Sequence, residues 1–175
     1  MNIGDIAFPN LVIYLKHVPR SFSIFGFLIA FYGLIIGVGV ILSLLLVCHI
    51  AKKTGQDPDD YWDFAIYAVL CSLLGARIYY VIFSWDEYKD NLLEIFKVRN
   101  GGLAIYGGVI AGFITLFVWC HFKKKKALLV GDTAINGLIL GQAIGRWGNF
   151  MNREVFGDYY NGLFSMQIPI ADVRD

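Results

Sequence analysis

Several polar residues follow one another closely in the sequence near the end of a long apolar, glycine-rich segment. The group comprises Arg146, Asn149, Asn152 and Glu154, and the preceding twenty or so residues are otherwise typical of a membrane span. A charged side chain costs roughly 2.5–3.5 kcal/mol at the centre of a span, so it usually faces a protein interior or water. Arginine offers a planar fork of donors that suits phosphate or carboxylate, and amides suit hydroxyls. The pattern predicts a site for a polar or anionic group at the membrane surface.

Helical spacing places part of this group on one face. Gln142, Arg146, Asn149 and Arg153 fall in a narrow stripe at about 100° per residue, beside a face rich in glycine. The stripe predicts a surface that lines a cavity. An alternative is that Arg146 and Glu154 form an internal ion pair with no ligand, and the spacing leaves both open.

The composition is that of a membrane protein. Hydrophobic residues make up 57% of the 175 residues and charged residues only 17%, against about 25% in soluble domains. The net charge of +1 is not accompanied by a basic face, so no nucleic-acid partner is expected. The three cysteines and three histidines show no metal-ligand spacing, so we expect no metal site. No cleavable signal peptide is predicted.

The elements that must position the polar group are membrane spans. Stretches of about 20 apolar residues predict four transmembrane helices, at about 23–50, 62–83, 102–122 and 128–150. The fold class expected is therefore an all-α polytopic membrane protein, with residues 1–175 as a single membrane-embedded domain. Small-residue spacings such as Gly33-x-x-x-Gly37 and Gly108-x-x-x-Gly112 predict close helix packing.

Lysine and arginine in short loops set the predicted orientation. Lys52 and Lys53 follow the first span, and four lysines occupy 123–126, so these loops are placed in the cytoplasm. The longer loop 84–101 contains Lys89, Lys97 and Arg99, and is placed on the opposite side. The N-terminus and the polar group at the end of the last span are then expected to face outward.

The stretch 145–157 resembles the signature of the prolipoprotein diacylglyceryl transferases, Gly-Arg-x-Gly-Asn-x-x-Asn-x-Glu-x-x-Gly, and matches it at every defined position. Three more segments resemble family motifs in the same order. They are Phe31-Tyr32-Gly33, the segment from Gly75 to Phe83, and Gly101-Gly102 through Tyr106-Gly107-Gly108.

This resemblance implies an enzyme of the bacterial cytoplasmic membrane with an outward-facing lipid head-group cavity. It would transfer the diacylglyceryl group of phosphatidylglycerol to the lipobox cysteine thiol of a prolipoprotein, forming a thioether and releasing glycerol phosphate. No metal or organic cofactor is required.

The resemblance also implies roles for individual residues. Arg146 would bind the lipid phosphate, Asn149, Asn152 and Glu154 would shape the head-group site, and Gly157 would allow close backbone approach. Tyr32 and Arg77 also stand at family positions and are candidates for substrate binding. For Arg77, the alternative is snorkelling to the outer interface.

Two departures from the family pattern accompany this resemblance. Tyr106 stands where many members have histidine; a tyrosine is a poor base at neutral pH but can orient a substrate through its hydroxyl. The alternative for Tyr106 is an interfacial aromatic anchor.

The family also continues through further spans with another important arginine, so we expect the C-terminal spans to be absent here. A second hypothesis is therefore an inactive, truncated paralogue that binds anionic phospholipid or serves as a membrane scaffold. A small transporter is disfavoured, because the polar group lies toward one end of its span rather than at mid-membrane.

Overall fold

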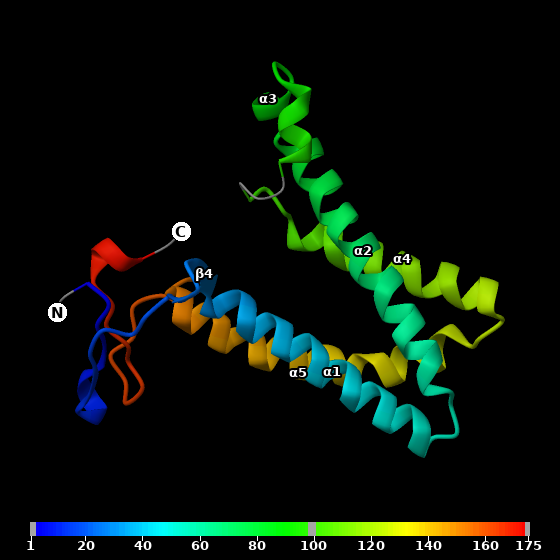
Figure 1. Ribbon diagram of the computed structural model, residues 1–175, viewed down its shortest axis with the longest axis horizontal. Helices are drawn as coiled ribbons and strands as arrows, with labels where there is room; N and C mark the ends of the chain where they lie inside the picture. The colour runs from blue at the N-terminus through cyan, green and yellow to red at the C-terminus, as the bar shows by residue number, and fades with distance from the viewer. Residues whose placement is uncertain (1–2, 98–100, 174–175) are drawn as a thin grey trace. The chain divides into compact units, whose positions relative to one another are not determined.

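Four long helices dominate the structure. The computed structural model describes residues 3–97 and 101–173, so Arg99 lies outside the described residues. The long helices are α1 (Phe31–Lys53), α2 (Pro58–Phe83), α4 (Ile105–Lys123) and α5 (Ala127–Asn152) (Figure 1). Each is long and apolar enough to cross a membrane. The prediction of a mostly helical, multi-pass membrane protein is thus confirmed.

The start of α2 follows from its capping residues. The Asp57 side chain accepts a hydrogen bond from the Asp59 backbone N–H at 3.0 Å, and Pro58 occupies the first turn. Proline lacks the N–H that this position would leave unpaired, and the carboxylates of Asp59 and Asp60 face the positive end of the helix. The sequence therefore determines this boundary locally.

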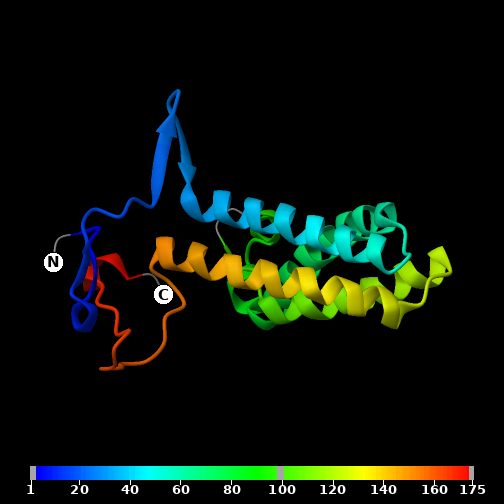
Figure 2. The ribbon, with the colours of Figure 1, turned by 90° about the horizontal axis from the view of Figure 1, so that it is seen from below.

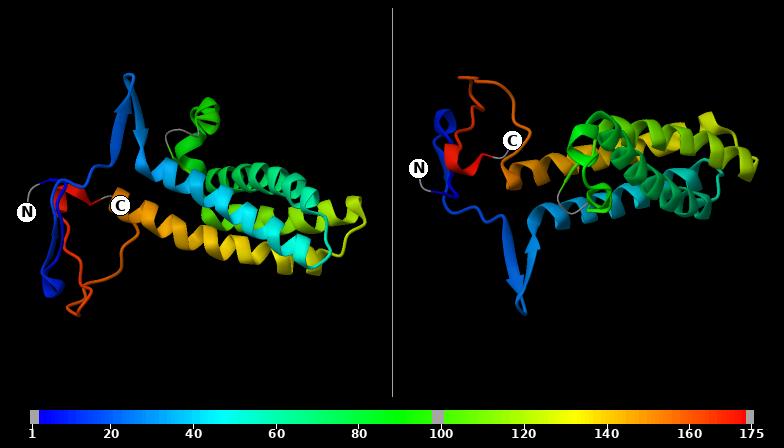
Figure 3. Two further views of the ribbon diagram at one scale, coloured as in Figure 1. Left: turned by 60° about the horizontal axis from the view of Figure 1, so that its bottom comes forward. Right: turned by 90° about the horizontal axis from the view of Figure 1, so that it is seen from above.

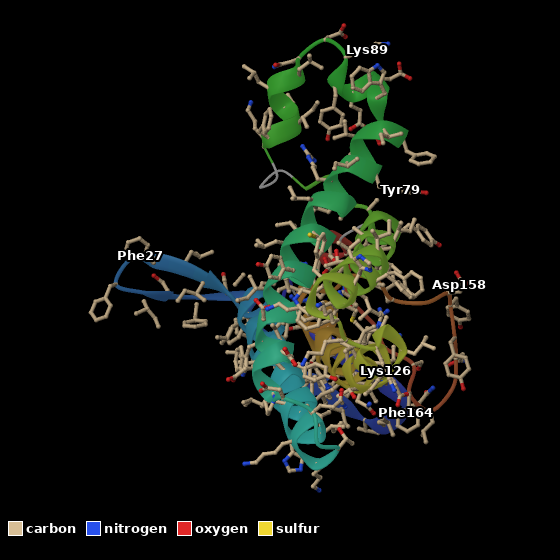
Figure 4. The ribbon with its side chains drawn as sticks, turned by 90° about the vertical axis from the view of Figure 1, so that its right-hand side faces the viewer. Phe27, Tyr79, Lys89, Lys126, Asp158 and Phe164 are labelled. Carbon is tan, nitrogen blue, oxygen red and sulfur yellow. The ribbon has the colours of Figure 1, made fainter. Side chains whose placement is uncertain are left out.

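The chain before α1 forms two short antiparallel hairpins, where the sequence predicted helix from residue 23. Strand β1 (Ile6–Phe8) pairs with β2 (Ile13–Leu15), and β3 (Ser21–Ile24) pairs with β4 (Phe27–Ala30). A short helix, η1 (Pro9–Leu11), joins the first two strands. The second hairpin turns at Phe25 and Gly26, whose φ angles of 49° and 83° are both positive, as a two-residue type I′ turn requires. Figure 2 shows this hairpin projecting from the start of α1, and Phe27 lies at its tip in Figure 4.

The chain divides into two compact units. The first contains residues 1–43 and 138–175, and the second contains residues 44–137, so α1 and α5 contribute to both. The single domain over residues 1–175 remains a prediction.

In the first unit, the N-terminal hairpin pairs with the segment after α5 (Figure 3). The backbone groups of Ala7 and Gln167 exchange two hydrogen bonds, of 3.1 and 2.8 Å. A short helix, η4 (Ile170–Asp172), follows. Segments distant in sequence therefore meet around the end of α5.

In the second unit, α2 and α4 lie side by side (Figure 1) and approach most closely at glycines. A Cβ atom at Gly75 would lie 2.7 Å from the Gly107 carbonyl oxygen, and a Cβ atom at Gly107 would overlap the Gly75 carbonyl oxygen. In contrast, a Cβ atom at Gly33 or Gly37 would meet nothing within 4 Å. The close approach predicted for the Gly33-x-x-x-Gly37 spacing is therefore not seen among the described residues.

The core of the second unit lies near the loops that join α1 to α2 and α4 to α5. Its buried residues are Val47, Ala51, Tyr61, Trp119, Cys120 and Val130. The Tyr61 hydroxyl donates to Gln56, whose side-chain amide donates to Thr133 at 2.9 Å. After α2, the chain forms the short helices α3 (Trp85–Tyr88) and η2 (Leu92–Phe96) before α4; Lys89, labelled in Figure 4, lies between them.

Candidate functional site

The polar group predicted from the sequence lies at the C-terminal end of α5, where the helix closes in a left-handed cap. Arg153 follows the last helical residue with φ of 58°. Its backbone N–H donates to the Phe150 carbonyl at 3.2 Å, and the Glu154 N–H donates to the Asn149 carbonyl at 3.1 Å. This pair of bonds is the Schellman motif, which satisfies the last carbonyls of a helix.

The cap brings the Glu154 carboxylate against two amides. The Asn149 side-chain N–H donates to one carboxylate oxygen at 3.1 Å, and the Asn152 side-chain N–H donates to the other at 3.0 Å. Hydrogen bonds to an ionised acceptor are stronger than those between neutral groups. The signature residues are therefore joined around one carboxylate.

Arg146 lies beside this network and keeps most of its donors available. Its side chain is exposed, and Nη1 reaches the Asn149 side-chain oxygen only at 3.5 Å. Among the described residues, Arg146 forms no ion pair with Glu154, so the alternative of an internal Arg146–Glu154 pair is not seen here. A guanidinium with unused donors at a helix end can bind an anionic group.

A largely apolar pocket adjoins Arg146. It has a volume of about 430 Å³ and is lined by Arg146, Trp147 and Phe150 of α5 together with Phe8 and Leu15 of the N-terminal hairpin. The Phe8 and Phe150 rings stack with their centres 6.5 Å apart. A ligand with an anionic group and an apolar body would match this combination of one cation and four apolar side chains.

Tyr32 also lies against this part of α5. A Cβ atom at Gly148 would lie 3.1 Å from the Tyr32 ring, so glycine lets the ring pack on the helix between Arg146 and Asn149. Gly157, in contrast, is exposed, and a Cβ atom there would meet nothing within 4 Å. The close backbone approach expected at Gly157 stays a prediction.

Arg153 departs from the predicted polar stripe. The helix ends at Asn152, so the stripe that joined Arg146 and Arg153 is broken, and the Arg153 side chain is only 1% exposed. It donates to the backbone carbonyls of Gly4 at 2.9 Å and Val18 at 2.6 Å. Burial lowers the pKa of the Arg153 guanidinium, and the Asp172 carboxylate nearby acts in the opposite direction.

Arg77 belongs to the second unit and binds loop backbone. Its guanidinium donates to the carbonyls of Ile95, Glu94, Gly101 and Gly102 at 2.8–2.9 Å, and its side chain lies 5.1 Å from the centre of the Tyr88 ring. Arg77 is 8% exposed, so snorkelling to the interface does not describe it. Four of its five N–H donors are occupied by the segment between α2 and α4, which leaves little capacity for a ligand.

Tyr106 also belongs to the second unit, in the first turn of α4, and is 70% exposed. The other predicted site residues lie in the first unit, where Tyr32, Arg146, Asn149, Asn152 and Glu154 come together at the end of α5. Across residues 3–97 and 101–173, no cluster of three or more histidine, cysteine or acidic side chains could hold a metal ion.

The comparison with protein families extends over almost all of this architecture. A family model described as prolipoprotein diacylglyceryl transferase matches residues 19–174. The chain belongs to this family. The match includes the four long helices, the capped end of α5 and the segment that pairs with the N-terminal hairpin.

Curated relatives agree with the family assignment. Proteins named phosphatidylglycerol–prolipoprotein diacylglyceryl transferase are 44% identical over 140 residues in Limosilactobacillus reuteri, 47% over 154 residues in Finegoldia magna and 43% over 141 residues in Clostridioides difficile. These alignments cover 80%, 88% and 81% of this chain, but 51%, 62% and 57% of the relatives. The chain therefore spans about half to three fifths of the length of these relatives.

Proposed function

We propose that this chain carries the lipid head-group site of a phosphatidylglycerol–prolipoprotein diacylglyceryl transferase. The observation on which this depends is the end of α5, where an exposed Arg146 stands between an apolar pocket and the Asn149–Glu154–Asn152 network. The pocket offers apolar contact, the guanidinium offers charge, and the amides offer hydrogen bonds. Phosphatidylglycerol combines acyl chains, a phosphate and a hydroxylated head group, so it matches all three.

The proposed reaction makes one carbon–sulfur bond and breaks one carbon–oxygen bond. The lipobox thiolate attacks the glyceryl carbon that bears the phosphate ester, and the electron pair of the broken bond leaves with glycerol phosphate. Arg146 stabilises the charge that develops on this phosphate; losing one such preorganised donor typically costs about 2.7–4 kcal/mol of barrier. The nucleophile comes from the substrate, so none is required from the enzyme.

The thiol must lose a proton for this attack, because the thiolate is the reactive form. Glu154 provides a carboxylate that is linked to Arg146 through Asn149 and can accept this proton. Tyr32 packs beside the same turn, and Tyr106 is proposed to orient the substrate through its hydroxyl. No step requires a metal or an organic cofactor.

The proposed location is the bacterial cytoplasmic membrane, with the N-terminus and the end of α5 facing outward. The lysines at 52, 53 and 123–126 support this orientation, because short cytoplasmic loops carry an excess of positive charge. A site at that face would meet prolipoproteins after export, and phosphatidylglycerol would enter from the outer leaflet.

A reconstituted assay tests the proposal. Proteoliposomes that contain acyl-labelled phosphatidylglycerol are incubated with a lipobox peptide, and the thioether product is detected by mass spectrometry. A peptide with serine in place of the lipobox cysteine is the substrate control. Arg146→Gln is expected to lower product formation at least about a hundredfold, whereas Lys89→Gln, at an exposed ion pair of the second unit, leaves it unchanged.

Two outcomes would contradict the transferase proposal. No thioether from folded wild-type protein excludes transfer by this chain. Phosphatidylglycerol binding that is sensitive to Arg146→Gln but gives no product would support the second hypothesis, a non-catalytic protein that binds anionic lipid.

A further inference from the structure

Arg153 stands at an undefined position of the family signature, between Asn152 and Glu154, so the motif assigns it no role. The structure nevertheless buries its side chain to 1% exposure beside the proposed site. A buried arginine is rare unless it is paired and hydrogen-bonded. Its contacts therefore require a physical explanation.

The backbone at Arg153 adopts a conformation that normally favours glycine. Its φ of 58° places it in the left-handed region at the residue after the helix, and Val155 follows with φ of 53°. Glycine is the usual residue at this capping position, and a β-branched residue with positive φ is an outlier. Such conformations persist only where the surroundings hold them in place.

The Arg153 side chain supplies that hold through contacts with three chain segments. It donates to the carbonyls of Gly4 and Val18 in the N-terminal segment and to Met151 in α5, at 2.6–3.3 Å. Its Nε lies 3.9 Å from a carboxylate oxygen of Asp172, which is itself only 4% exposed. That carboxylate also accepts the Gly4 backbone N–H. We call this set, Arg153 with Gly4, Val18 and Asp172, the clasp.

We propose that Arg153 is a positioning residue whose clasp holds the turn that aims Glu154 at Asn149 and Asn152. This inference rests on the proposed function, because the position of Glu154 matters for lipid binding only if the end of α5 is the lipid site. Glu154 is the next residue along the chain, and its backbone N–H donates the second hydrogen bond of the cap, to the Asn149 carbonyl. If the clasp is lost, the left-handed turn relaxes and the carboxylate leaves the two amides, although Arg153 is not among the residues that line the pocket beside Arg146.

A double-mutant cycle separates positioning from a general loss of structure. Phosphatidylglycerol binding to the full chain is measured in nanodiscs for wild type, Arg153→Gln, Glu154→Gln and the double variant. Each single change is expected to weaken binding about tenfold, and the double variant no more than Glu154→Gln alone, because both act through one carboxylate. Independent effects would multiply to about a hundredfold and would overturn the inference.

The matched control is Arg20→Gln. Arg20 also contacts Asp172, but among the described residues it forms no hydrogen bond or ion pair with the turn at 153–155. This variant disturbs Asp172 of the clasp while leaving the hydrogen bonds of Arg153 to Gly4 and Val18, and it is expected to change binding less than twofold. A tenfold loss in Arg20→Gln would show that any disturbance around Asp172 weakens binding, which would also refute a specific role for Arg153.

A second measurement needs no lipid binding. Selective ¹⁵N labelling of asparagine reports the side-chain amides of Asn149 and Asn152 by nuclear magnetic resonance in micelles. Arg153→Gln should shift both resonances as Glu154→Gln does, whereas Arg20→Gln should not. Unchanged resonances in Arg153→Gln would overturn the inference, whatever the lipid result.

Wild-type protein without preference for phosphatidylglycerol over phosphatidylcholine would instead contradict the proposed function. Should Arg153→Gln fail to fold, Arg153→Lys takes its place, since lysine keeps the charge but loses the forked donors.

Discussion

Two helix ends provide a matched test of what the Arg153 side chain contributes to stability. Helix α5 is followed by Arg153 with φ of 58°, and helix α4 is followed by Lys124 with φ of 55°. Both helices close with the same pair of backbone hydrogen bonds. Lys124 is exposed, and its side chain has no hydrogen bond or ion pair among the described residues, whereas Arg153 forms the clasp. Replacing each residue with glycine therefore makes the same backbone change with a different loss of side-chain contacts.

The two substitutions are expected to change the free energy of unfolding in opposite directions. A residue other than glycine in the left-handed conformation costs roughly 1–2 kcal/mol, so replacing it with glycine removes that cost. Glycine also has more conformational freedom in the unfolded chain, which offsets about 0.5–1 kcal/mol of this gain. Lys124→Gly should therefore raise the free energy of unfolding by up to about 1.5 kcal/mol. Arg153→Gly has the same backbone benefit but removes the hydrogen bonds from the charged guanidinium to the Gly4 and Val18 carbonyls, each worth about 1.5–3 kcal/mol. We expect a net loss of at least about 1.5 kcal/mol in the free energy of unfolding.

The assay is reversible unfolding in mixed micelles, followed by far-ultraviolet circular dichroism as the denaturing detergent fraction rises. Wild type, Lys124→Gly and Arg153→Gly are compared in the same micelles. If Arg153→Gly proves as stabilising as Lys124→Gly, the clasp contributes nothing to stability. If Lys124→Gly is strongly destabilising, the reasoning about left-handed caps is wrong for this protein.

Three further predictions concern the second unit. Gly107→Ala should cost about 1–3 kcal/mol of stability in the same unfolding assay, because its Cβ atom would overlap the backbone of α2. The control, Gly33→Ala, should cost nothing, because a Cβ atom there meets nothing within 4 Å. Equal effects of the two substitutions would contradict close packing at Gly107. Arg77→Gln should speed hydrogen exchange of the backbone amides at 89–97 without changing exchange in the spans; unchanged loop protection would refute its bracing role. A hydrogen bond from Lys125 to Asp60 raises the lysine pKa above its ordinary 10.5. The stability that the charged Lys125 contributes is therefore fully present below pH 10.5 and is lost as the pH rises through the raised pKa. The difference in stability between wild type and Lys125→Met should shrink in strong alkali.

The helices were predictable because their signals are local. Long uncharged runs indicate spans, and the Asp57-Pro58 pair indicates where α2 begins. The start of α1 was not predictable in the same way. The run from Ile24 to Ala30 is as apolar as the helix that follows, and a short apolar run does not distinguish strand from helix by periodicity. The turn at Phe25-Gly26 was the available signal, because glycine at a positive φ permits a two-residue hairpin.

Arg153 shows the limit of reasoning from helical spacing. The stripe placed it with Arg146 by assuming that the helix continues, but α5 ends one residue earlier. The partners that bury Arg153 are Gly4, Val18 and Asp172, which no spacing rule connects to it. Arg77 is similar, since its partners lie on a loop whose path depends on the packing of α2 and α4.

The signature itself is explained better by the cap than by the stripe. In a Schellman motif, the residue two beyond the cap commonly packs against the residue three positions inside it, usually through an apolar contact. At the end of α5 these positions are occupied by Glu154 and Asn149, and a hydrogen bond of 3.1 Å replaces the apolar contact. Asn152 is the capping residue itself and reaches the other carboxylate oxygen. The spacing Asn-x-x-Asn-x-Glu therefore corresponds to the geometry of one helix terminus. For this reason the motif places Asn149, Asn152 and Glu154 beside Arg146, although helical spacing misplaces Arg153.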